Sequence, residues 1–216
     1  MRAIFAGLLA TLTLVGCGTA PRFTAIAPHA SGWAAADYNE GPKDQNAEMP
    51  ARFAEIVNKH EDLLFRGGIP TDAQLEKLVE DGVASKQAGK NVKIKTIINL
   101  LADNDKLKID HEEAYAKAHK VKFINIQLPW GKIPPKADVD TWFDAVTAAR
   151  KAKTALYIHC THGRDRTGSM VGVYREQYDG YSPAMALGEM ESDAFGYDPK
   201  PYPWMTEFVL TFKVTK

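Results

Sequence analysis

The feature that most constrains the fold is a regular alternation of short apolar segments with longer segments of helical periodicity. Strand-like runs, rich in apolar and β-branched residues, fall at residues 63–66, 92–101, 121–128 and 155–159. Helix-like segments fall at residues 71–79, 110–120, 137–151, 166–179, 183–192 and 203–212. Strands separated by helices pair in parallel and bury both faces of their sheet. The sequence therefore predicts an α/β fold, with a central, mostly parallel mixed sheet of about four to five strands flanked by helices on both faces.

Apolar residues at helical spacing predict which face of two helices is buried. One stripe follows Thr71, a residue type that caps helix N-termini, and consists of Leu75, Leu78 and Val79. The other belongs to segment 137–151 and consists of Val139, Trp142, Phe143 and Val146. We expect both stripes to pack in the core.

Charge and cysteine content exclude several classes of protein. Lysines and arginines number 27 and acidic residues number 27, so no overall charge attracts nucleic acid, and any anion site must be local. The 2 cysteines, Cys17 and Cys160, are too few for a disulfide scaffold or a cysteine zinc cluster. No motif indicates a metal, a cofactor or an obligate protein partner.

The first residues have the layout of an export signal. A positive charge at Arg2 precedes an apolar run over residues 3–15, which is too short to span a bilayer comfortably. The segment ending in Gly16-Cys17 resembles the lipobox of bacterial lipoproteins, in which the cysteine is acylated. We therefore predict a lipoprotein signal peptide over residues 1–16 and lipidation at Cys17; an ordinary cleaved signal is the alternative. Because Gly18 follows, the resemblance implies an exported protein anchored at the outer membrane, facing the periplasm or the outside.

The region after the signal lacks apolar periodicity. Residues 17–50 are rich in alanine, glycine, proline and small polar residues, a composition that suits a tether. The regular pattern begins at about residue 51. We predict one domain over residues 51–216, joined to a membrane anchor.

The chemistry is concentrated where the last strand-like segment meets a helix. This segment reads His159-Cys160-Thr161-His162-Gly163-Arg164-Asp165-Arg166-Thr167-Gly168. Such a loop can point backbone N–H groups inward beside the positive end of the helix, which makes a phosphate cradle. The same donors favour a thiolate at Cys160. A planar guanidinium at Arg166 can hold two phosphoryl oxygens, which lysine cannot.

Glycines suit this loop at two positions. Gly163 permits the backbone conformation that the turn needs, and Gly168 lets the helix pack closely. His159 is interpreted as orienting the loop through backbone hydrogen bonds, whereas His162 is either solvent-exposed or in contact with substrate.

The loop resembles the signature of the cysteine-dependent phosphatases, a cysteine and five residues followed by Arg-Thr-Gly. Upstream, Phe65-Arg66-Gly67-Gly68-Ile69-Pro70 and Ile97-Ile98-Asn99-Leu100 are similar to the bacterial and plant dual-specificity-like branch. The resemblance covers about residues 63–190 and, more loosely, extends to the phytase class. It implies Cys160 as nucleophile, Arg166 as its catalytic partner and a hydrogen bond from Thr167 to the sulfur. It also implies a phosphate-binding loop made of Thr161, His162, Gly163, Arg164, Thr167 and Gly168.

The sequence departs from this family at the general acid. The family places an aspartate on the loop before segment 137–151, but residues 127–136 contain no carboxylate. The alternatives are Asp103, Asp105, Asp138, Asp140 and Asp165. Asp138 also suits the charge of a helix N-terminus. We favour Asp165, as in phosphatases with Asp-Arg-Thr-Gly, although it could instead form an ion pair with Arg66 or another base.

The expected substrate is a small phosphorylated molecule. His162, Arg164, Lys132 and Lys136 can surround the cradle with positive charge, which suits a ligand with several phosphates. An exported enzyme also encounters soluble polyphosphorylated molecules. The sequence thus predicts a cysteine-dependent phosphatase acting on inositol polyphosphates such as phytate. The alternatives are a protein phosphotyrosine or dual-specificity phosphatase and a phosphoanion-binding lipoprotein without activity.

Overall fold

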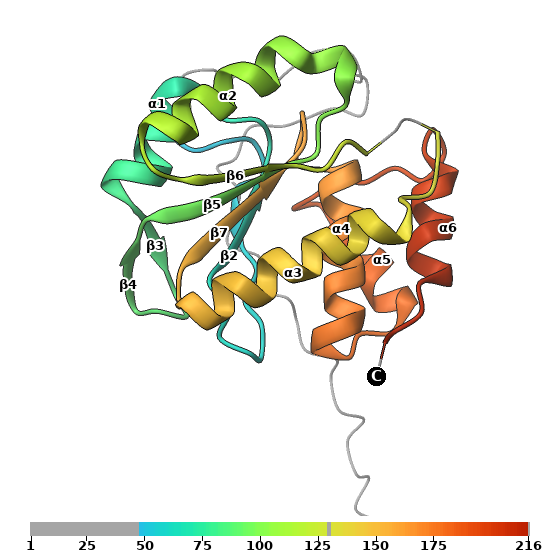
Figure 1. Cartoon of the computed structure of the whole chain (residues 1–216). Coiled ribbons are helices and arrows are strands. Elements are labelled where there is room, and N and C mark those ends of the chain that lie inside the picture. The colour runs from blue at the N-terminus through green and yellow to red at the C-terminus, as the bar shows by residue number, and fades with distance from the viewer. Residues whose placement is uncertain (1–47, 129–130, 216) are drawn as a thin grey trace, which may run out of the picture.

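The computed structural model describes residues 48–128 and 131–215 (Figure 1). The predicted signal peptide, the lipidation at Cys17 and nearly all of the predicted tether lie outside these residues, as do Pro129 and Trp130 of the proline-containing loop. Among the described helices, none is both long enough and apolar enough to cross a membrane.

A five-stranded sheet forms the centre of the domain, in the order β1-β2-β7-β5-β6. Its strands are β1 (Ala54–Glu55), β2 (Leu64–Gly67), β5 (Ile94–Asn99), β6 (Lys122–Asn125) and β7 (Ala155–His159). Strands β2, β7, β5 and β6 pair in parallel, and only the edge strand β1 is antiparallel to its neighbour. The predicted mostly parallel sheet is confirmed.

Helices cover both faces of the sheet, as predicted (Figure 1). One face carries α1 (Asp72–Glu76) with its π-helical continuation η1 (Lys77–Asp81), and α2 (Lys106–Ala118) after the short η2 (Asp103–Asp105). The other carries α3 (Lys136–Ala152), α4 (Asp165–Tyr174) with η3 (Arg175–Asp179), α5 (Pro183–Glu191) and α6 (Pro203–Thr211). Thr71 caps α1 as predicted, within a reciprocal capping box with Gln74.

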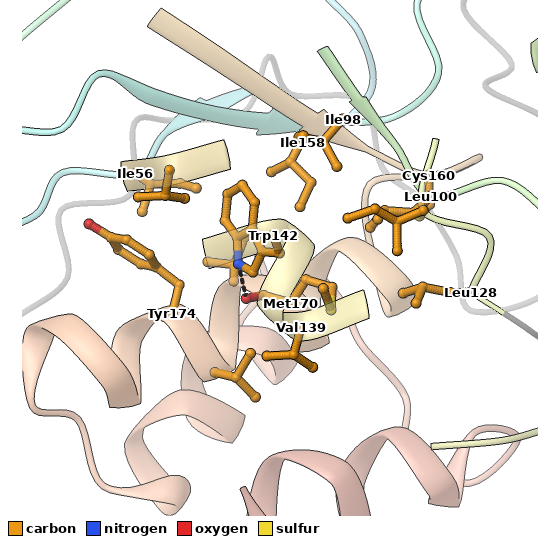
Figure 2. Packing of buried hydrophobic residues seen from close by; sticks show 14 of the residues in the cluster. Ile56, Ile98, Leu100, Leu128, Val139, Trp142, Ile158, Cys160, Met170 and Tyr174 are labelled. Atoms are coloured by element: carbon orange, nitrogen blue, oxygen red, sulfur yellow. Dashed lines mark hydrogen bonds between the residues drawn. The ribbon is translucent and has the colours of Figure 1, made fainter. Parts of the chain in front are cut away.

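The core consists of two clusters, one on each face of the sheet. Along β7, Tyr157 packs in the smaller cluster under α1 and α2, whereas Ile158 packs in the larger one under α3 to α6. Trp142 fills the centre of the larger cluster, and its indole N–H donates to the carbonyl of Met170 at 3.0 Å (Figure 2). Of the stripe predicted on α3, Val139, Trp142 and Val146 are buried, and Phe143 packs half-buried at the margin.

Two strand-like segments are divided differently from the prediction. Residues 92–101 do not form one strand, because residues Lys90–Val92 form β4, which pairs antiparallel with β3 (Val83–Ser85) in a separate hairpin. The chain then enters β5, which ends at Asn99. Similarly, only the first half of segment 121–128 is strand, and helix α2 starts four residues before the predicted 110.

Candidate active site

The loop from Cys160 to Arg164 leaves the middle of the sheet. It follows β7, which lies between β2 and β5, and leads directly into α4. Ligands bind beyond the carboxyl ends of parallel strands, and this loop occupies that position. Arg164 at the N-cap of α4 makes no side-chain capping bond, so its side chain does not occupy the first backbone N–H groups of the helix.

Gly163 is required by the conformation of the loop. Its φ is +70°, and a Cβ atom there would overlap the backbone of Gly67 and Gly68 at the end of β2. A Cβ on Gly168 would lie 3.3 Å from the side chain of Met190, so this glycine lets α4 and α5 approach closely. Both predicted roles are confirmed.

Two arginines, Arg66 and Arg52, donate hydrogen bonds to backbone carbonyls of the loop. The Arg66 guanidinium donates to the carbonyl of Gly163 at 3.0 Å and lies 3.7 Å from the ring centroid of Phe195. Burial lowers the pKa of Arg66 to about 10, so it stays charged at neutral pH. Arg52 donates to the carbonyls of His162 at 3.2 Å and Phe195 at 2.9 Å. The sequence contained no signal for Arg52, since its contacts are with residues more than a hundred positions away.

The pKa of the Cys160 thiol is lowered although only 3% of the residue is exposed. The thiol lies at the rim of the larger cluster with Leu100 and Leu128 (Figure 2). Burial raises the pKa of Cys160. The positive charge of Arg166 and the backbone of Thr167 lower it by more than burial raises it, so the net pKa lies below the usual value. The Thr167 hydroxyl is buried without a hydrogen-bond partner, so the bond to the sulfur that was predicted for Thr167 does not come from this hydroxyl.

Arg166 is fixed by two contacts to its guanidinium. Nη1 donates to the carbonyl of Leu100 at 2.9 Å, and Nη2 donates to the Thr161 hydroxyl at 3.3 Å. A guanidinium has more N–H donors than these contacts use, so the others can hold an anion. The Leu100 backbone N–H in turn donates to the carbonyl of His159 at 2.9 Å, which ties the end of β5 to the loop.

His159 contacts the loop backbone, as its predicted orienting role requires. It is fully buried, and its Nδ1 lies 3.4 Å from the carbonyl of Cys160. Its Nε2 lies 3.0 Å from a carboxylate oxygen of Glu112 on α2, a residue that the sequence did not indicate. Burial lowers the pKa of His159, but the charge and hydrogen bond of Glu112 outweigh it, so the net pKa is raised.

Asp165 pairs with Arg164 and lies within electrostatic reach of Cys160. Its carboxylate accepts from Arg164 Nε at 3.0 Å, so its ion-pair partner is Arg164 and not Arg66, whose guanidinium faces Gly163. The charge of Asp165 acts to raise the pKa of Cys160, which places the two side chains within electrostatic reach.

The other candidate acids differ in their surroundings. Asp138 lies in the first turn of α3 without capping it, and burial alone raises the pKa of Asp138. Asp105 pairs with Lys108 at 2.7 Å and Asp140 with Lys136 at 2.6 Å. Asp103 is exposed in η2. Among these carboxylates, it is the charge of Asp165 that acts on the pKa of Cys160.

Of the other residues predicted to contact substrate, some lie in the loop and some do not. Thr161, His162 and Arg164 are half-buried in the loop, whereas Lys132 before α3 and Lys136 at the start of α3 are exposed. Within the described ranges, no group of three or more histidine, cysteine, aspartate or glutamate side chains could hold a metal ion.

This fold, with a low-pKa cysteine and an anchored arginine in one loop, defines the class of cysteine-dependent protein tyrosine and dual-specificity phosphatases. Within that class, the chain belongs to the family described as "DSP-PTPase phosphatase fused to NAD+ Kinase", whose model matches residues 44–198. The resemblance expected from the sequence is therefore confirmed.

Individual relatives are distant. The chain is 25% identical over 133 residues to the dual specificity protein phosphatase TpbA of Pseudomonas aeruginosa (strain UCBPP-PA14), covering 62% of this chain and 52% of that protein. The chain thus spans about half the length of this curated relative.

Solved structures show the same fold. The core catalytic domain of the PP-IP phosphatase Siw14 from S. cerevisiae matches with a TM-score of 0.54 at 20% identity, over 76% of this chain and 86% of that one. Pseudomonas aeruginosa TpbA in complex with pTyr matches with a TM-score of 0.51 at 21% identity, over 73% and 88% of the two chains.

Proposed function

We propose that this chain hydrolyses phosphomonoesters through a phosphocysteine intermediate. The observation that carries the proposal is the Cys160 sulfur, held in a loop where Arg166 and Thr167 lower its pKa. The thiolate attacks phosphorus, the P–O bond breaks, and the leaving oxygen takes a proton. Water then attacks phosphorus, the P–S bond breaks, and inorganic phosphate leaves. Backbone N–H groups of the loop and the Arg166 guanidinium hold the charged oxygens throughout.

Inositol polyphosphates are the proposed substrates, phytate among them. Arg52, Arg164 and Arg166 share the small region around the loop, and the charge of Arg164 acts against that of Arg52. Asp165 offsets part of this positive charge. An anion with several phosphates would offset the rest, which a single phosphotyrosine does less completely. The structural likeness to Siw14, a PP-IP phosphatase, supports the same substrate class.

A protein phosphotyrosine is the second candidate, favoured by the likeness to TpbA, which is a dual specificity protein phosphatase and was solved with pTyr. The test is phosphate release from inositol hexakisphosphate and from a phosphotyrosine peptide, measured side by side. We expect the larger kcat/KM with the inositol phosphate. Faster release from the peptide would favour the second candidate. No release from either, together with tight phosphate binding, would favour an inactive phosphoanion-binding protein.

Asp165 is proposed as the general acid. The charge of its carboxylate acts on the pKa of Cys160, which places it close to the reacting group. Protonation of the leaving oxygen matters most when that oxygen is a poor leaving group. We expect Asp165→Asn to lower kcat by about 10²-fold for an alkyl phosphate and by less than about tenfold for nitrophenyl phosphate. Asp138→Asn is the matched comparison. A leaving-group dependence that changes in Asp138→Asn and not in Asp165→Asn would transfer the role to Asp138.

Export and lipid anchoring through Cys17 are proposed from the sequence, on the apolar run at residues 3–15 and the lipobox-like segment that ends at Cys17. Labelled fatty acid is expected to enter the full-length chain and not Cys17→Ser. Equal labelling of both chains would refute lipidation at this cysteine.

A further inference from the structure

A row of polar residues crosses the sheet immediately behind the phosphate loop. In the strand register, His159 of β7 pairs with Gly67 on one side and Asn99 on the other, and Asn99 pairs with Asn125 of β6. Residues paired across strands share one face of a sheet. This is the face covered by α1 and α2, because Tyr157, two residues before His159, packs in their cluster. The row therefore lies beneath α2.

The side chain of Glu112 on α2 contacts two residues of this row, Asn99 and His159. Only 2% of Glu112 is exposed, and its Oε2 accepts from Asn99 Nδ2 at 2.6 Å while facing His159 Nε2 at 3.0 Å. The Asn99 amide cannot turn around, because its Oδ1 accepts from the Leu101 backbone N–H at 2.7 Å and from Asn125 Nδ2 at 3.3 Å. The hydrogen bond from Asn99 thus holds Glu112 against His159, and Asn99 is itself fixed by Leu101 and Asn125.

Both ring nitrogens of His159 face oxygen acceptors. Nε2 faces the Glu112 carboxylate, and Nδ1 faces the carbonyl of Cys160 at 3.4 Å. A carbonyl oxygen and a carboxylate can only accept, so the doubly protonated imidazolium satisfies both contacts, and a neutral ring leaves one nitrogen without a hydrogen to donate. The titratable groups that face His159 are Glu112 from α2, Cys160 from the loop and Tyr157 from its own strand, whose ring stacks at 5.4 Å.

We infer that Glu112 is a positioning residue for the nucleophile, holding His159 as an imidazolium behind Cys160. This inference rests on the proposed function, since it concerns the thiolate that would attack phosphorus. An interaction between two charges is mutual: a thiolate at Cys160 raises the pKa of His159, so an imidazolium lowers the pKa of Cys160. The Glu112 carboxylate contacts Nε2, whereas the Cys160 carbonyl contacts Nδ1 on the other side of the ring. The negative charge of Glu112 therefore raises the pKa of Cys160 less than the imidazolium lowers it.

The inference is tested on the thiol itself. In Glu112→Gln the side chain keeps its shape and loses its charge, so His159 becomes neutral and the Cys160 thiolate loses a favourable charge. We expect the rate of alkylation by iodoacetamide, measured below the pH at which the wild-type thiol is fully ionised, to fall about tenfold. Glu113→Gln is the matched control, because Glu113 is the exposed neighbour on the same helix, and its alkylation profile should equal that of the wild type.

A double-mutant cycle separates positioning from general destabilisation. Because Glu112 is inferred to act through His159, Glu112→Gln should have no further effect on alkylation in a His159→Gln background. Glu112→Asp, which retains the charge, should recover part of the rate. Additive effects in the double variant, or a wild-type profile in Glu112→Gln, would overturn the inference.

A measurement on the wild-type protein covers the case in which the variants do not fold. Nitrogen chemical shifts of the His159 ring, measured by nuclear magnetic resonance at neutral pH, should be those of an imidazolium; the shifts of a neutral ring would refute the inference. The proposed function is tested separately, since turnover that survives Cys160→Ser would refute it whatever the state of His159.

Discussion

Cys160→Ser is expected to lower the rate of phosphate release by at least about 10⁴-fold while inorganic phosphate still binds. Serine has nearly the shape of cysteine, but its hydroxyl is not ionised at neutral pH, and an alkoxide is a poor leaving group from phosphorus. The cradle remains, because the loop N–H groups and the Arg166 guanidinium do not depend on the sulfur. The measurements are single-turnover phosphate release and calorimetric titration with inorganic phosphate.

The second cysteine of the chain supplies the matched control for this result. Cys17→Ser removes the other thiol and should leave turnover unchanged in the detergent-solubilised chain. Trapping of a phosphorylated protein after rapid acid quench is expected for the wild type and for Cys17→Ser only. If Cys160→Ser keeps more than about a tenth of wild-type turnover, the phosphocysteine route is wrong.

The architecture followed from periodicity where segments were long enough to show it. Strand β7 and helices α3 and α5 have nearly the predicted limits, because apolar spacing and flanking residues agree over several turns or a whole strand. Strands β1 and β3 are two and three residues long, which is too short for any period to be visible. Their existence depends on pairing with distant residues, and the sequence could not reveal it.

The site shows the same division between local and distant information. Cys160, Gly163 and Arg166 belong to one contiguous motif, so the sequence places them together. Glu112 lies in the charged run 110–113, where it looks like one more exposed acid of an amphipathic helix. Its role depends on a contact with a histidine 47 positions away, which only the packing of α2 on the sheet creates. Arg52 was missed for the same reason.

Arg166→Lys is expected to lower kcat by about 10³-fold with a smaller effect on KM. Lysine keeps the positive charge, but a single ammonium cannot bond the Leu100 carbonyl, contact Thr161 and hold two phosphoryl oxygens together, as the planar fork can. The oxygens gain most from that fork when the phosphoryl group is in transfer, so the loss falls on kcat.

Alkylation of Cys160 separates the geometry of this arginine from its charge. In Arg166→Lys the alkylation rate should stay within about threefold of the wild type, because the charge that lowers the pKa of Cys160 is retained. The matched control is Arg150→Lys. The Arg150 guanidinium donates through two nitrogens to the Asp62 carboxylate, each at 2.7 Å. This variant should leave turnover unchanged. Were alkylation to fall as far as kcat in Arg166→Lys, the arginine would act by ionising the thiol rather than by holding the transferred group.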